Sequence, residues 1–289
     1  MSPFQRHIAA CNNLVLPAGL VPFRIGGAQV GWLGPALAEA LAALPHDFRP
    51  DEQGGVALDS RLDSPAARSA ALATAARTLA GRGLFRLRDE AFDVRATPEG
   101  PVLARLDRGA LPAFGILSQG VHVNGRVRRP DGGLHLWVGW RARDKAVAPG
   151  KLDNLIAGGI PAGLSVEETL LKEAGEEAGV PPELARQARR VGRVSYVMAT
   201  EEGTRRDVLH LYDLDLPEGF TPQPQDDEVE RFELWPARRV LEAVRDTDEV
   251  KFNVNLVLLD LFLREGLIPP EGEEGRRLRA GLDPGVGGP

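Results

Sequence analysis

The sequence contains a single cysteine, Cys11, among its 289 residues. One cysteine excludes a disulfide bond within the chain and any zinc site built from several thiolates. Such sparing use of cysteine is typical of a reducing compartment, and we expect a cytoplasmic protein.

Long hydrophobic runs and an excess of basic charge are also missing. No stretch approaches the roughly 20 apolar residues that a membrane span needs, and polar residues interrupt the first segment too early for a secretory signal. Lysine and arginine number 35 against 41 acidic residues, which gives a formal net charge of −6. A nucleic-acid-binding protein normally presents a basic face. We therefore expect neither a membrane nor a nucleic acid as a partner.

The sequence does contain a mixed pattern of helices and strands. In the first part, helical apolar spacing occurs at 34–45 and 64–83, and strand-like alternation at 92–96 and 101–106. Ser64 followed by a proline is a typical helix start. These features predict an α+β module over residues 1–111, called the N-terminal module below.

The second part of the chain is richer in strands. Strand-like segments occur at 113–127, 133–143, 153–159, 192–200, 207–216 and 228–235, and helical spacing at 237–244 and 253–266. This pattern predicts an α+β domain over residues 112–271. Residues 272–289 lack a continuing apolar pattern and end in glycine and proline, so we expect a mobile tail there.

Five glutamates fall within one predicted helix, in the segment GLSVEETLLKEAGEEAGV (163–180). Ser165 and Glu168 have the spacing of a capping box, and Gly179 is a typical residue after a helix end. The buried face is predicted from the i, i+4 series Val166, Leu170, Ala174 and Ala178.

Two of the glutamates, Glu173 and Glu177, share the arc of this apolar face, with Glu176 beside it. Carboxylates four residues apart repel one another. Lys172 is predicted on the far side, paired with Glu168, so no basic residue compensates. A solvated acidic face is the alternative, and it explains Glu168 better than Glu177. A divalent cation would supply the missing charge, and oxygen ligands favour Mg²⁺ or Mn²⁺.

A glycine-rich loop precedes this helix, with Gly158, Gly159 and Gly163 in AGGIPAG (157–163). Glycines allow the backbone to approach a ligand closely, and the start of the following helix favours anions. A strand, a glycine loop and an acidic helix in succession are therefore expected to form a site for a metal and a phosphate.

Residues 158–180 resemble the Nudix box, G-x5-E-x7-R-E-U-x-E-E-x-G-U, where U is aliphatic. Gly158 matches its first glycine, and Gly179 with Val180 closes it. The acids of the box align with Glu173, Glu176 and Glu177, and its arginine with Lys172. Leu164 stands where the box has its first glutamate, which removes one usual carboxylate.

The resemblance extends over most of the chain. Segments 19–41, 137–180, 212–234 and 251–271 are similar to a Nudix subgroup related to the domain fused to thiamine pyrophosphokinase in fungi. This resemblance implies a Nudix α/β/α sandwich with a mixed sheet, preceded by a smaller α+β module. It also implies Mg²⁺-dependent hydrolysis of an organic diphosphate, such as thiamine diphosphate or its oxidised analogues, to the monophosphate and phosphate.

The resemblance further implies roles for individual residues. Glu173, Glu176 and Glu177 would hold Mg²⁺ with a backbone carbonyl near Gly158, and Glu177, Glu176 and Lys172 would be catalytic. The general base is left open among Glu177, Asp226, Asp227 and Glu228. Gly159, Lys151, Lys251 and Asn253 are the candidate substrate contacts.

Several alternatives remain at this stage. The substrate could be a nucleoside diphosphate derivative such as ADP-ribose, or the domain could bind a ligand without catalysis, which Leu164 and Lys172 favour. An isomerase on this fold would need an active-site cysteine, and Cys11 is remote in sequence. The N-terminal module could cover the substrate pocket or form a homodimer contact. The five histidines show no metal-ligand spacing and are expected to be ordinary strand or surface residues.

Overall fold

The computed structural model describes residues 2–145 and 147–286, and its centre is a seven-stranded sheet. Five strands run in the order β11-β12-β7-β8-β13, with β10 beside β7 and β9 beside β8. Their bounds are β7 Leu117–Arg128, β8 Leu134–Arg141, β9 Leu152–Asp153, β10 Ile156–Gly159, β11 Arg189–Thr200, β12 Gly203–Asp215 and β13 Val229–Pro236. The β7–β12 pair is parallel and the other pairs are antiparallel, so the sheet is mixed, as expected.

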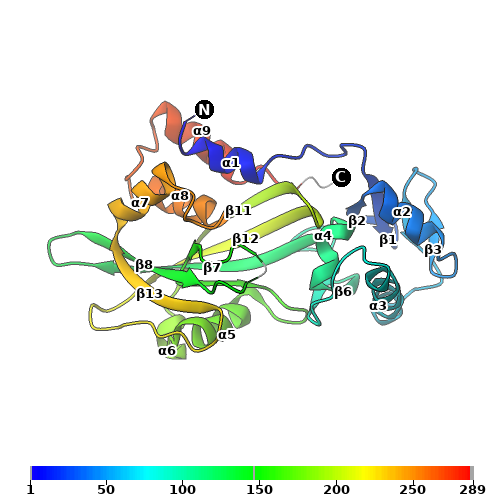
Figure 1. Ribbon diagram of the computed structural model, residues 1–289, viewed down its shortest axis with the longest axis horizontal. Coiled ribbons are helices and arrows are strands. Elements are labelled where there is room, and N and C mark those ends of the chain that lie inside the picture. The colour runs from blue at the N-terminus through cyan, green and yellow to red at the C-terminus, as the bar shows by residue number, and fades with distance from the viewer. Residues whose placement is uncertain (1, 146, 287–289) are drawn as a thin grey trace.

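Helices cover both faces of this sheet (Figure 1). One face carries α5 (Val166–Ala178) and α6 (Pro182–Ala185), whose apolar side chains pack on alternate residues of β7 such as Val121 and Val123. The other face carries α7 (Ala237–Asp246) and α8 (Val254–Arg264). Successive strand residues point to opposite faces, so β8 and β12 contribute to both cores. The predicted α/β/α sandwich is confirmed.

The predicted mobile tail is wrong over residues 273–282. Helix α9 (Glu273–Leu282) lies there, and its Leu278 and Leu282 are buried in the same core as α8. Only these two large apolar residues, one turn apart, anchor a mostly charged helix, so the sequence pattern was too sparse to reveal it. Residues 287–289 of the predicted tail lie outside the described residues.

The first helix, α1 (Gln5–Cys11), also packs on the sandwich. Phe4 and Cys11 belong to the core formed with α8 and α9, whereas the sequence pattern had placed this segment in the N-terminal module. The adjacent α1 and α9 therefore bring the two ends of the described chain to one face of the sheet (Figure 1).

The rest of the N-terminal module forms a separate core beside the sandwich (Figure 1). Its four-stranded sheet has the order β2-β1-β4-β3, with bounds β1 Val21–Ile25, β2 Ala28–Leu33, β3 Phe48–Pro50 and β4 Val56–Leu58. These short strands were not predicted. Its other elements are α2 Pro35–Ala42, α3 Pro65–Gly81, the hairpin β5 Ala91–Val94 with β6 Ala104–Asp107, the 3₁₀ turn η1 Arg108–Ala110, and α4 Leu111–Phe114, which lies at the junction. Ser64 caps α3, as predicted, by accepting from the Ala67 N–H. No helix among the described residues is long and apolar enough to cross a membrane.

Candidate active site

Helix α5 begins and ends as the sequence predicts. Ser165 and Glu168 form the reciprocal capping box, and Gly179 ends the helix in the left-handed conformation with φ of 60°. Leu170, Ala174 and Ala178 are buried, and they carry the helix on the sheet. This packing fixes which acids face the protein and which face solvent.

Glu177 is the most deeply placed acid of α5, with 5% of its surface exposed. Its Oε2 atom accepts a hydrogen bond of 2.8 Å from the backbone N–H of Ala157 on β10. Burial raises the pKa of Glu177 to about 8, against the opposing effect of that hydrogen bond, and the neighbouring Asp153 and Glu173 raise it further. Because the isolated carboxylate is costly to ionise there, the position favours a bound cation.

Glu173 and Glu176 differ in their surroundings. Glu173 is mostly buried against the glycine loop, and a Cβ atom on Gly158 would lie 2.6 Å from its Cγ and Cδ atoms. Burial raises the pKa of Glu173. Glu176 lies at the surface, with 54% of its side chain exposed. The carboxyl groups are thus spread from the core side of α5 to solvent.

The prediction that no basic residue compensates these acids is wrong. The Lys172 ammonium lies 3.2 Å from Oε1 of Glu173 and 2.5 Å from Oε2 of Glu176. Lys172 does not pair with Glu168, whose carboxylate instead accepts from the Ser165 N–H in the capping box. Long lysine side chains reach either neighbour on a helix surface, so angular position alone did not decide the partner. Among the residues that the structure describes, a basic partner is therefore present for Glu173 and Glu176 but not for Glu177.

Within residues 2–145 and 147–286, no three acidic, histidine or cysteine side chains converge into a ready metal centre. The donor set nevertheless fits a hard divalent cation, because it consists of carboxylate and carbonyl oxygens. The Lys172 ammonium already occupies a cation position between two of the three predicted acids. Glu173, Glu176, Glu177 and the Gly158 carbonyl remain the residues that could hold Mg²⁺ or Mn²⁺.

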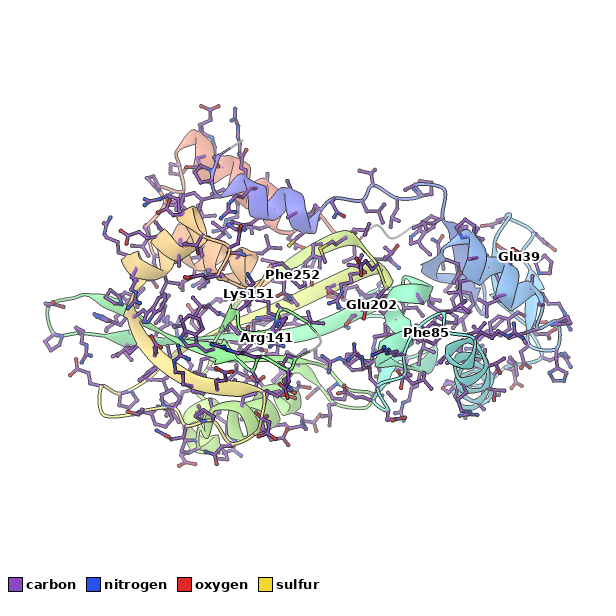
Figure 2. The ribbon with its side chains drawn as sticks, in the orientation of Figure 1. Glu39, Phe85, Arg141, Lys151, Glu202 and Phe252 are labelled. Carbon is purple, nitrogen blue, oxygen red and sulfur yellow. The ribbon has the colours of Figure 1, made fainter. Side chains whose placement is uncertain are left out.

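A cavity of about 360 Å³ lies between the sheet and the N-terminal module. Five residues predicted for the site line it, namely Gly158, Gly159, Glu228, Lys251 and Asn253. Figure 2 labels three further lining residues, Arg141, Glu202 and Phe252. Residues 157–159 of β10 line the cavity, while Glu177 and Glu173 contact Ala157 and Gly158 of the same strand. The cavity and the acidic helix therefore share β10.

Positive side chains outnumber negative ones around the cavity. The cations are Arg88, Arg108, Arg141, Lys145, Arg205 and Lys251, and the acids are Glu90, Glu202, Asp207 and Glu228. Lys251 and Arg141 both donate to Oδ2 of the buried Asp153, each at 2.9 Å. Burial would raise the pKa of Asp153, but these two cations lower it overall. The cavity has the charge expected for binding an anion.

Asn253 contributes an unsatisfied acceptor to the cavity wall. Its side chain is buried, and among the described residues Oδ1 has no hydrogen-bond partner. Its Nδ2 atom donates over 3.4 Å to the hydroxyl of Tyr196, which in turn donates over 2.5 Å to Asp207. A buried polar atom without a partner costs about 1–3 kcal/mol, so Asn253 is held at this position at a cost in stability.

Two residues predicted for the site, Lys151 and Asp227, lie outside the cavity. The Lys151 ammonium donates over 2.5 Å to the backbone carbonyl of Asp248, so it is held away from the glycine loop. Asp227 is exposed in a turn that Asp226 closes by accepting from the Glu228 N–H. Of the acids offered as bases from this turn, only Glu228 lines the cavity, where it pairs with Lys145 at 3.1 Å.

His122 is a cavity residue that the sequence analysis overlooked. Its ring is buried on β7, and Nδ1 lies 2.8 Å from Oδ1 of Asn154. The Asn154 amide donates to Asn124, and the Asn124 amide donates to Asp213, each over 2.9 Å. Asp213 also accepts hydrogen bonds from arginines, so it is the acceptor at the end of this series. Each asparagine amide therefore donates towards Asp213, and its oxygen accepts from the preceding side chain. Nδ1 is therefore the donor, and Nε2 carries the lone pair.

Two family models together cover most of the chain. A NUDIX domain matches residues 119–254, and a domain of unknown function (DUF4743) matches residues 3–118. Together with the α/β/α sandwich and the glycine loop followed by an acidic helix, these matches define a Nudix hydrolase domain with an N-terminal companion.

Relatives with similar sequences support the same family assignment. The chain is 38% identical over 288 residues to Nudix hydrolase 24, chloroplastic, of Arabidopsis thaliana, covering 97% of this chain and 79% of that protein. It is 38% identical to Nudix hydrolase 20, chloroplastic, of the same plant, covering 94% and 75%. A MutT protein from Methanosarcina mazei is similar in structure with a TM-score of 0.40 and 14% identity, covering 52% of this chain and 95% of that one. The chain belongs to the Nudix hydrolase family.

Proposed function

We propose that this Nudix hydrolase cleaves the diphosphate of an organic diphosphate to a monophosphate and phosphate with the help of Mg²⁺. The observation that carries the proposal is the arrangement at β10. Glu177, a buried carboxylate with no basic partner in the described part of the chain, contacts this strand at Ala157, and the strand also lines a cavity rich in cations. An acidic metal site and a basic anion site on one strand suit a substrate that bridges the two.

The residues around β10 would have different roles in the reaction. Glu173, Glu176 and Glu177 would hold the metal with the Gly158 carbonyl. When bound, the metal would neutralise the phosphate charge and lower the pKa of water, with Mn²⁺ as a substitute for Mg²⁺. Lys251 lines the cavity and would bind the phosphates, with its position fixed by Asp153. Gly159 lines the cavity and would contact the substrate through its backbone, since the Phe92 ring fills the space that a side chain there would take.

Hydrolysis adds water across the P–O–P bond, so one proton of the water must be accepted. Glu228 lines the cavity and Glu177, on α5, accepts a hydrogen bond from β10, and both remain candidates for this base. Asp227 is a weaker candidate because it is exposed outside the cavity. Lys172 would act by holding the Glu173 and Glu176 carboxylates in place.

For the substrate, we propose thiamine diphosphate or its oxidised analogues, in line with the resemblance of several segments to the thiamine-related subgroup. Asn253, which lines the cavity, would contact the organic part of the substrate. The first alternative is that the substrate is ADP-ribose. The second alternative is that the domain binds a ligand without catalysing its hydrolysis. Location in the cytoplasm and a homodimer stay predictions from the sequence.

A phosphate-release screen over diphosphate compounds, with and without Mg²⁺, tests this proposal. We expect Mg²⁺-dependent release from thiamine diphosphate or an oxidised analogue. Glu177→Gln keeps the size of the side chain and should lower kcat at least about 100-fold. Glu183→Gln, at an exposed acid on α6, is the matched control and should behave as wild type. Tight binding of one compound with no release from any would support the non-catalytic alternative.

A further inference from the structure

The cavity is built from two parts of the chain that belong to different family models. Arg88, Phe92 and Arg108 enter it from the N-terminal module, whereas Gly158 and Gly159 enter it from β10. The module is therefore part of the cavity wall, and its contacts with the glycine loop show how.

Two hydrogen bonds, one to a backbone carbonyl and one to a side-chain carboxylate, join β5 of the module to the loop that follows β10. The Ala162 N–H donates over 2.8 Å to the carbonyl of Ala91, and the Gly163 N–H donates over 3.5 Å to Asp93. The glycine loop is thus fixed to the module at its far end, and to α5 through Glu173 at its near end.

Gly159 lies in direct contact with the module. A Cβ atom at this position would lie 2.7 Å from Cζ of Phe92 and 4.0 Å from the guanidinium carbon of Arg108. The Arg108 guanidinium stacks over the Phe92 ring at 5.6 Å from its centroid. Phe92 therefore holds a positive charge beside the backbone that we assign to phosphate binding.

The charges on this side of the cavity leave room for an anion. Arg108 donates to Glu90 over 2.8 Å, yet about half of its side chain remains exposed. Arg88 and Arg205, one from each part of the chain, share the carboxylate of Glu202 at 3.6 and 3.4 Å. Both guanidinium groups line the cavity and share this one carboxylate, with the buried Asp207 as a further acid near Arg205 and Arg108.

We propose that the N-terminal module completes the active site, and that Arg108 binds the diphosphate of the substrate beside Gly159. This inference rests on the proposed function, since it assigns a partner to the same substrate. A guanidinium group suits this role because its planar fork matches two phosphate oxygens. The module acts as a substrate-binding wall, which accounts for its packing against the glycine loop.

Binding of inorganic diphosphate to the full chain, measured by calorimetry without added metal, tests this role. We expect Arg108→Gln to weaken binding at least about tenfold, which corresponds to roughly 1.4 kcal/mol, and Arg108→Lys to restore part of it. Arg77→Gln, at an exposed arginine of α3 in the same module, is the matched control. Glu90→Gln should tighten binding, because it frees Arg108 from its carboxylate.

These variants separate the inference from the proposed function. Equal diphosphate binding by wild type and Arg108→Gln, or no binding by the wild type, would overturn the role of Arg108, whatever Glu177→Gln does to hydrolysis. Weaker binding by Arg108→Gln in a protein that hydrolyses nothing would support the anion site and refute the hydrolase proposal. Thermal unfolding of each variant confirms that its fold is kept, and a purely structural ion pair would make Glu90→Gln weaken binding too.

Discussion

Glu173 occupies the space in which Gly158 would carry a side chain, with its Cγ and Cδ atoms 2.6 Å from that Cβ position. The first glycine of the loop and an acid of α5 are therefore complementary in shape. A glycine is required here by the neighbouring carboxylate and not by a turn, because Gly158 lies within β10.

Gly158→Ala should displace Glu173 and disturb the proposed metal site. We expect kcat to fall at least about tenfold and the free energy of unfolding to fall by about 1–3 kcal/mol. Gly175→Ala, on the exposed side of α5, is the control. Its added methyl group meets no atom within 4 Å, so it should stabilise the protein by about 0.5–1 kcal/mol and leave kcat unchanged. Wild-type kinetics for Gly158→Ala would argue against a role of Glu173.

Lys172 is expected to position Glu173 and Glu176. Lys172→Met would leave these carboxylates without their shared cation, and we expect about a tenfold loss of kcat with little change in the melting temperature. Lys172→Arg keeps the charge and can donate to both acids, so its kcat should stay within about threefold of wild type. If Lys172→Met were as active as the wild type, Lys172 would form only a surface ion pair with no effect on turnover.

Asn253→Ala should affect substrate binding more than turnover. Asn253 lines the cavity, and the loss of one contact with the substrate would raise KM about tenfold with kcat within about twofold. Asn13→Ala removes an exposed asparagine outside the cavity and serves as the control in steady-state kinetics. A fall in kcat at constant KM would contradict a binding role.

His122 should make stability depend on pH. Burial and the nearby Lys251 lower its pKa from 6.5 to about 4, against the opposing charge of Asp153. Between these values the unfolded chain binds a proton that the folded protein does not. The stabilisation is therefore complete above pH 6.5 and is lost as the pH falls towards 4.

Urea unfolding at pH 7.5 and pH 5.0 measures this effect. Wild type should lose about 2 kcal/mol more stability on acidification than His122→Asn, which cannot titrate but can still donate to Asn154. His46→Asn, at an exposed histidine, should follow the wild type. Identical losses in wild type and His122→Asn would show that the ring is protonated in the folded protein.

Local sequence patterns predicted α5 and the α+β character of the chain well, because capping residues and apolar spacing act within a few turns, whereas the sandwich itself was implied by the Nudix resemblance. They could not place Lys172, whose flexible side chain reaches several partners, or α9, which is held by two leucines only. Nor could they reveal His122, whose role in the cavity depends on Asn154 and other residues distant in sequence. Long-range packing, not local preference, brings Arg108 to Gly159.

Helix α1 has a practical consequence for any attempt to produce the Nudix part alone. A fragment that begins near residue 119, where the NUDIX match starts, would lack α1 and would uncover the apolar surface on which Phe4 and Cys11 pack. A fragment that ends near residue 118 would carry α1 with no surface to receive it. We expect both halves to aggregate when expressed separately, and co-expression to be needed to recover a soluble pair.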